Sequence, residues 1–344
     1  MGAVPDYMLS RKSAWHGLGN IIGRFFSSDE ILSIPELNYG VGKYQLIDPF
    51  THEPIPVWGT FREDGEKKTF LKEVGKDYTI LHHSLGVKML DDLIRADESQ
   101  KTYFETAGTL WGGAVFFASL KLPQDIHVGN DTLRPFLCQT SAYNGRYAEN
   151  YFLSIHRPVC ENTVDLALAA ASAMFKVYHT KSGEKKLKDA HAAILAIGTD
   201  IQSVEEKLNF LNARMMTKDT VESIFNRLFP KTKKEDGRED SSTRRDNIII
   251  EIMKNFEDND NHTFKDQEGT AYSFLNSITK FVDHQRSSHN GEKGRRESAT
   301  MGSGADLKSS AMDLITQCAQ SLPPKLAPIK IQTNNPSLAE LVNV

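Results

Sequence analysis

The sequence is poor in cysteine and has no long apolar run. Its 344 residues include three cysteines, Cys138, Cys160 and Cys318, without CxxC spacing. A small and odd number of cysteines argues against a disulfide framework and favours a reducing compartment. No secretory apolar segment opens the chain, and no apolar run approaches the length of a membrane span. We therefore expect a soluble cytoplasmic protein without a membrane partner.

An excess of basic residues is also missing. The chain has 41 Lys and Arg against 45 Asp and Glu, giving a formal net charge of -4 and a pI near 6.3. This balance excludes a globally basic nucleic-acid binder. A local basic groove remains possible, because the field at a site depends on nearby charges rather than on the total. The length suffices for one large domain or two ordinary ones.

The clearest pattern that is present lies between residues 103 and 180. Three runs, residues 103–120, 132–143 and 151–157, are rich in aromatic and β-branched residues. They end at Pro123, at Asn144-Gly145 and at Pro158, which interrupt strands or form turns. The pattern predicts three consecutive antiparallel strands.

The periodicity changes after these strands. Val164, Leu168, Ala171 and Phe175 follow one another at intervals of four, three and four, which places them on one face of a helix. Asn162 is a suitable N-cap for this helix. The sequence thus predicts three strands packed under one helix.

The predicted fold class is α+β. Residues 39–78 favour further strands with a hairpin turn at Asp64-Gly65, and residues 231–245 form a mixed-charge linker. Helical spacing recurs at residues 29–37, 85–94, 186–212, 218–229, 247–256, 272–284 and 305–322. We expect four regions: an N-terminal β-rich layer (1–98), the central strand-and-helix module with its following helices (99–230), a flexible linker (231–246), and a C-terminal helical region with a tail (247–344).

Several ordered motifs carry a family resemblance. They are WHGLG at residues 15–19, YFETAGTLWGG at 103–113, RPVCENT at 157–163, YHT at 178–180 and GSGADLK at 302–308. With these motifs the chain resembles the phage/plasmid-like proteins of domain-of-unknown-function family 932. The resemblance implies a phage, prophage or plasmid origin, hence the cytoplasm of a host cell. The family has no established activity.

The expected module also has a looser likeness. Three antiparallel strands followed by a helix is similar to the core of single-strand-annealing recombinases, which assemble into rings or filaments and hold DNA in a basic groove. This likeness implies a homo-oligomer that binds single-stranded DNA without nucleotide hydrolysis. It is a likeness of topology, which by itself says little about function.

Annealing requires cations along a backbone path and flat side chains on which bases stack. Residues of these types occur at the strand ends, in the Asn144-Gly145 turn and in the terminal motifs. The predicted nucleic-acid-binding residues are Trp15, His16, Lys121, Arg134, Tyr143, Arg146, Tyr147, Arg157 and Lys308.

Each of these predictions has a structural alternative that the sequence leaves open. Trp15 can pack as an N-terminal lid, and Arg146 can extend into solvent from an ordinary hairpin. Arg157 can pair with a carboxylate such as Glu105 or Asp165. Lys121 and Arg134 belong to one surface only if strand alternation puts them on the same side. Lys308 lies with Arg295 and Arg296 near a glycine-bearing loop before a helix, which favours anion binding or a disordered loop.

An enzyme would require cysteine and histidine side chains to lie close together in space, and the sequence does not establish that they do. Cys160 with His156 or His179 would make a nucleophile and base, and Cys138, His156 and Cys160 would make metal ligands. The carboxylates are scattered, so two-metal nuclease chemistry has no support. We expect no enzyme, no cofactor and no metal. The rival hypothesis is a protein-interaction module that modulates host replication or defence by binding a host protein.

Overall fold

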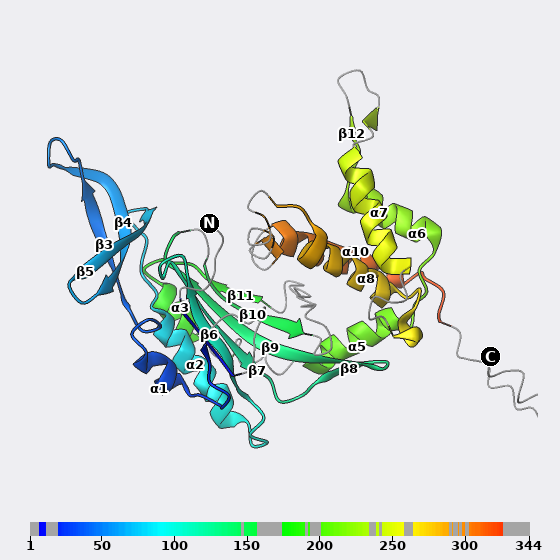
Figure 1. The fold of residues 1–344 in the computed structure, drawn as a ribbon, viewed down its shortest axis with the longest axis horizontal. Coiled ribbons are helices and arrows are strands. Elements are labelled where there is room, and N and C mark those ends of the chain that lie inside the picture. Colours follow the sequence, from blue (N-terminus) through cyan, green and yellow to red (C-terminus); the bar gives the residue numbers. More distant parts are fainter. Residues whose placement is uncertain are drawn as a thin grey trace, which may run out of the picture.

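The computed structural model in Figure 1 is an α+β protein organised around one large sheet, which confirms the predicted fold class. It describes residues 7–11, 20–145, 148–156, 174–189, 192, 201–233, 239–240, 243–257, 264–288, 291, 295, 298–299 and 303–325.

The central sheet has eight strands among the described residues, in the order β11, β10, β9, β7, β6, β1, β2, with β8 paired to β9. Neighbours are antiparallel, except that β1 and β2 are parallel. The strands are β1 (Tyr7–Ser10), β2 (Asn20–Ile21), β6 (Tyr103–Leu110), β7 (Val115–Lys121), β8 (Ile126–Val128), β9 (Asp131–Ala142), β10 (Glu149–His156) and β11 (Met174–Val177).

The run at residues 103–120, predicted as one strand, is a hairpin of β6 and β7. Its turn contains Trp111, Gly112 and Gly113, whose φ angles are +56°, +69° and +87°. Two glycines in this left-handed region reverse the chain without a steric penalty. Aromatic and β-branched residues on both sides of the turn made the two strands look continuous.

The predicted central helix falls largely on residues 157–173, which lie outside the described residues. Its last position is wrong, because Phe175 belongs to β11 and pairs with Tyr151 of β10. Phe175 and Val177 alternate at strand spacing and pack against the core. Pairing with β10 therefore overrides the helical spacing at this end.

The N-terminal region is rich in β-strands, as predicted, and its strands belong to two sheets. β1 pairs with β6, and α2 (His83–Ala96) packs against β7 and β9 beside α1 (Ser28–Ser33). A separate sheet consists of β3 (Gly40–Ile47), β4 (Pro54–Asp64) and β5 (Lys67–Val74). We call this sheet the β-arm, and Figure 1 shows it projecting from the body. The predicted hairpin turn is confirmed, with Gly65 at φ +62°.

The C-terminal region is helical, as predicted, and lies at the opposite end of the sheet from the β-arm (Figure 1). The run predicted at residues 186–212 is helical at both ends, and the predicted linker contains two short strands and the start of α7. The elements are α3 (Gly183–Asp189), α5 (Ile201–Asn212), α6 (Lys218–Leu228), β12 (Thr232–Lys233), β13 (Glu239–Asp240), α7 (Thr243–Glu257), α8 (Ala271–Lys280), a π-helical turn (Phe281–Gln285) and α10 (Ser303–Ala319).

One continuous hydrophobic core joins the sheet to these helices. α5 packs against β8, and α8 packs against α5, α7 and α10. Polar contacts fix the junction: the Tyr272 hydroxyl donates to Asp131 Oδ2 at 3.0 Å, and Gln267 Nε2 donates to the Val128 carbonyl at 3.0 Å. The C-terminal helices are thus anchored to the β8–β9 end of the sheet.

Candidate nucleic-acid interface

The two faces of the central sheet differ. Successive strand residues point to opposite faces, so Phe116, Leu120 and Leu137 enter the core while their neighbours in sequence do not. We call the second face the open face, because none of its residues belongs to the hydrophobic core. It consists of Tyr103, Thr106, Phe117, Ser119, Lys121, Arg134, Phe136, Cys138, Thr140, Asn150 and Phe152.

Half-buried phenylalanines occupy the open face. Phe117 of β7 and Phe152 of β10 are only partly covered. The Phe117 ring lies against the backbone of Gly108 on β6, where a Cβ would come within 2.5 Å of its Cζ. The absence of a side chain at Gly108 therefore leaves room for this ring against the backbone of β6. Flat rings on an antiparallel sheet are a geometry on which bases can stack.

Hydroxyl and amide groups lie between the rings. Thr106 and Ser119 share a hydrogen bond at 2.7 Å, and Asn150 Nδ2 donates to Thr140 Oγ1 at 3.3 Å. These pairs bridge neighbouring strands, so the middle of the open face is polar and internally satisfied.

Strand register places the two predicted cations on the same face. Lys121 pairs with Phe136, two residues from Arg134 along β9. Lys121 is buried, however, and its Nζ binds Asp125 at 2.9 Å and the Leu122 carbonyl. Arg134 is half-buried and has no hydrogen-bond or ion-pair partner in the described part of the chain. The available charge at this end of the face therefore belongs to Arg134.

Arg11 and two aromatic rings extend this end of the face. The Arg11 guanidinium lies 4.6 Å from the Tyr103 ring centre and 5.5 Å from that of Phe25. It donates to Glu105 at 2.9 Å and to the Tyr103 hydroxyl at 3.1 Å. Burial and then Glu105 raise the pKa of Tyr103, while Arg11 and Arg134 oppose the rise. Cations and rings are thus interleaved beside the open face.

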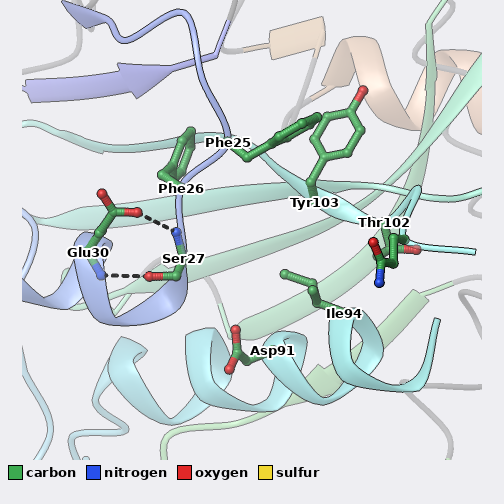
Figure 2. Close-up of a pocket in the computed structure, with 9 residues that line it drawn as sticks. Phe25, Phe26, Ser27, Glu30, Asp91, Ile94, Thr102 and Tyr103 are labelled. Atoms are coloured by element: carbon green, nitrogen blue, oxygen red, sulfur yellow. Dashed lines mark hydrogen bonds between the residues drawn. The ribbon is translucent and has the colours of Figure 1, made fainter. Parts of the chain in front are cut away.

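A pocket of about 380 Å³ shares Phe25 and Tyr103 with this cluster. Figure 2 shows the residues that line it. It lies between the segment that precedes α1, the α2 helix and the start of β6. Phe25 and Tyr103 lie next to one another at the pocket, while Asp91 and Ile94 project from α2. The lining residues are Phe25, Phe26, Ser27, Glu30, Asp91, Ile94, Gln100, Thr102 and Tyr103.

Local hydrogen bonds fix two walls of the pocket. Ser27 and Glu30 form a reciprocal capping box at the start of α1, with distances of 3.0 and 3.2 Å. Arg24 and then the Ser27 amide hold the pKa of Glu30 below its usual value. On the other wall Asp97 accepts hydrogen bonds from the amides of residues 99, 101 and 102. Burial would raise the pKa of Asp97, but hydrogen bonds from Ser99 and Thr102 hold it well below its ordinary value.

Two further predicted contact residues are buried. Tyr143 is fully enclosed, and its hydroxyl donates to His83 Nδ1 at 2.6 Å and accepts from the His83 amide at 2.8 Å. Lys308 is also enclosed and binds Asp283 at 2.9 Å. Neither side chain presents a surface to DNA, which corrects both predictions. Each lies where a polar group ties two elements together.

The remaining predicted contacts lie outside the described residues. They are Trp15, His16, Arg146, Tyr147 and Arg157. Arg296, named with Lys308, is also outside, while Arg295 Nε donates to the Asp283 carbonyl at 3.1 Å. Among the predicted residues that are described, Arg134 alone has an available charged group.

The core face carries a polar cluster that the sequence did not reveal. Glu149 Oε1 accepts from Gln139 Nε2 at 2.9 Å and from the Tyr151 hydroxyl at 3.0 Å, whereas Oε2 is buried without a partner among the described residues. Burial raises the pKa of Glu149 to about 7, against hydrogen bonds that lower it. Burial, and then His82, lower the pKa of His83 to about 3. Period-two spacing alone cannot show that these strand residues face inward.

The enzyme alternative depended on Cys160, which is outside the described residues. Cys138 lies half-buried on the open face, and His179 is packed against Tyr78 with its rings 4.8 Å apart. Burial lowers the pKa of His179 to about 4. The described residues contain no group of three or more His, Cys, Asp or Glu side chains placed to hold a metal ion.

A family profile described as "Domain of unknown function (DUF932)" matches residues 70–303, more than half of the chain. The chain belongs to the DUF932 family. The match covers the β6 to β11 strands that build the open face. Neither the curated proteins nor the solved structures contain a significant match to this DUF932 protein. None of its described helices has the length and apolar character needed to cross a membrane.

Proposed function

We propose that this DUF932 protein binds single-stranded DNA along the open face of its central sheet. The observation that carries the proposal is the presence of half-buried phenylalanines outside the core, beside an arginine without a partner in the described chain. Rings stack on any base, and a cation neutralises any backbone phosphate, so neither feature reads sequence.

The family resemblance suggests where in the cell this activity would take place. A phage, prophage or plasmid origin would place the protein in the cytoplasm of a host cell, where annealing proteins act during recombination. The likeness in topology that the sequence predicts between this module and single-strand-annealing recombinases supports the same activity. We therefore propose a strand-annealing role, carried out by a homo-oligomer without nucleotide hydrolysis.

Fluorescence anisotropy with labelled oligo-dT and a matching duplex, across a salt series, tests the proposal. We expect preference for the single strand and weaker binding as salt rises, because phosphate contacts release counterions. Phe152→Ala removes one ring, and stacking is worth about 1–3 kcal/mol per base, so binding should weaken by about 5- to 150-fold. Absence of binding even at low salt would overturn the proposal.

The matched control is Phe70→Ala, because Phe70 is 48% exposed and belongs to β5 of the β-arm, which projects from the body (Figure 1). This variant should bind DNA like the parent. Circular dichroism and thermal melting of both variants establish that they are folded.

A second candidate function, a protein-interaction module, is favoured by the β-arm itself. Tyr44, Phe61 and Phe70 form a ring cluster with centroid distances of 5.6 and 5.3 Å on a face of the projecting sheet. Exposed apolar patches of this kind mark protein-binding surfaces. Phe70→Ala would then abolish capture of a host protein while single-strand binding persists, so the same pair of variants separates the two functions.

A further inference from the structure

The pocket beside Tyr103 is connected to the open face but has a different chemistry. Tyr103 belongs to both, since its ring lines the pocket and its strand position places it on the open face. A strand that lies along the open face and reaches Arg134 thus arrives at the mouth of the pocket.

The apolar walls of the pocket suit a planar group. Phe25 is 59% exposed and meets Tyr103 at a centroid distance of 4.7 Å, and Ile94 forms the opposite wall. The volume of about 380 Å³ lies within the range of about 300–1,000 Å³ that is typical of small-molecule sites. One nucleobase fits such a space, with the Phe25 ring available for stacking.

Asp91 supplies the polar group that would select the base. Its side chain is 14% exposed, and its Oδ2 accepts from Arg95 at 2.5 Å. Within the described part of the chain its Oδ1 accepts no hydrogen bond. An ionised carboxylate only accepts hydrogen bonds, so a bound edge must donate them. Glu30 is less available, because Ser27 and Arg24 already occupy its oxygens.

Two guanidinium groups pair with the acidic side chains of the pocket, Arg24 with Glu30 and Arg95 with Asp91. Arg95 is 72% exposed and Arg24 59% exposed, so both extend into solvent beside the pocket. Ion pairs of exposed side chains contribute little stability, so either arginine can leave its carboxylate and bind a phosphate at a small cost in free energy. The pocket thus has a carboxylate inside and guanidinium groups outside. This arrangement matches a nucleotide, because its base edge donates hydrogen bonds and its phosphate is anionic.

We infer that the pocket accepts one guanine base of a single strand bound along the open face, with Asp91 as the specificity-determining residue. Guanine presents two adjacent donors, its N1–H and its 2-amino group, to a carboxylate, whereas thymine presents one N–H between two carbonyls. This inference rests on the proposed function, because the open face delivers the strand to the pocket.

The test compares labelled oligo-dT with the same oligomer carrying one internal guanine. A good two-donor contact discriminates between bases by about 1–3 kcal/mol, so the guanine should tighten binding by about 5- to 150-fold. Asp91→Asn should remove this preference while leaving oligo-dT binding intact.

The matched control is Asp92→Asn. Asp92 is the next residue on α2, is 43% exposed and also lies near Arg95, at 3.7 Å, but it does not line the pocket. The control should keep the full guanine preference. Phe25→Ala, at an exposed position, should weaken the guanine-containing oligomer more than oligo-dT and serves as the second variant if Asp91→Asn is unfolded.

The outcomes separate the two levels of inference. Equal affinity for both oligomers, with salt-dependent single-strand binding preserved, overturns the guanine pocket and leaves the proposed function standing. If no single strand binds, the proposed function falls, and titration with GMP followed by NMR decides the pocket. If GMP binds and Asp91→Asn abolishes this binding, the guanine pocket is supported. If GMP does not bind, the guanine pocket is overturned.

Discussion

The two faces of the central sheet are made by the same strands and differ in what they bury. On the core face Phe116 stacks on His83 at 4.3 Å and is fully enclosed. On the open face its neighbour Phe117 is only partly buried and lies against Gly108. Adjacent residues of one type therefore serve different purposes: the first contributes to stability, and the second offers a surface.

The polar groups differ between the faces as well. Polar atoms on the core face are arranged around enclosed groups such as Glu149 and His83, whereas Arg134 on the open face has no partner in the described chain. Buried polar groups require hydrogen bonds, since each unmade bond costs free energy. Substitutions on the core face should thus change unfolding, and substitutions on the open face should change binding.

Phe116→Ala should give the largest effect. Truncating an enclosed phenylalanine costs about 3–5 kcal/mol, through lost burial and the cavity left behind. Phe117→Ala should cost clearly less, because its ring is only half-buried, but should weaken single-strand binding. Urea unfolding and anisotropy measured on both variants check this. Equal losses of stability would remove the distinction between the two faces.

Tyr143→Phe should come next. The lost hydroxyl leaves His83 Nδ1 without a donor and the His83 amide without an acceptor inside the core. An unsatisfied buried group costs about 1–3 kcal/mol, so the midpoint of urea unfolding should fall while DNA affinity stays the same. Tyr178→Phe, at a position 67% exposed, is the control and should leave the midpoint unchanged.

Glu149→Gln should raise the stability of the folded protein at high pH, unlike the two preceding substitutions, which lower it. The pKa of Glu149 in the folded protein, about 7, lies above its ordinary value of 4.5. The folded state therefore holds a proton that the unfolded state releases between pH 4.5 and 7, and stability from this group declines as pH rises through that window. Above pH 7 the variant should melt at a higher temperature than the parent, and below pH 4.5 this advantage should vanish.

A neighbouring group gives the opposite slope and sharpens the measurement. The folded pKa of His83, about 3, lies below its ordinary value of 6.5, so stability from this group is lost as pH falls from 6.5 towards 3. Thermal melting of Glu149→Gln should thus show stability rising with pH between 4.5 and 6.5. A pH profile identical to that of the parent would show that Glu149 does not remain protonated in the folded state.

The difference between the faces also explains what the sequence could predict. The α+β class, the β-arm hairpin and most C-terminal helices follow from local periodicity and turn residues. Local pattern did not reveal that Tyr143 points inward, because this depends on strand register and on contact with His83 of a helix distant in sequence. It also did not reveal that Asp125, four residues further along the chain, pairs with Lys121. The pocket joins residues near positions 25, 91 and 103, and no single motif contains them.

Arg134→Gln should give the smallest effect and the most specific one. Removing one phosphate contact should weaken binding about equally for all single-stranded sequences and lower the slope of log affinity against log salt by about 0.7. Stability should hardly change, since Arg134 has no partner in the described chain to leave unsatisfied. Arg95→Gln makes the same charge change near the pocket. It should lower the affinity for guanine-containing oligomers only. A salt slope unchanged in Arg134→Gln would mean that the strand does not cross this end of the open face.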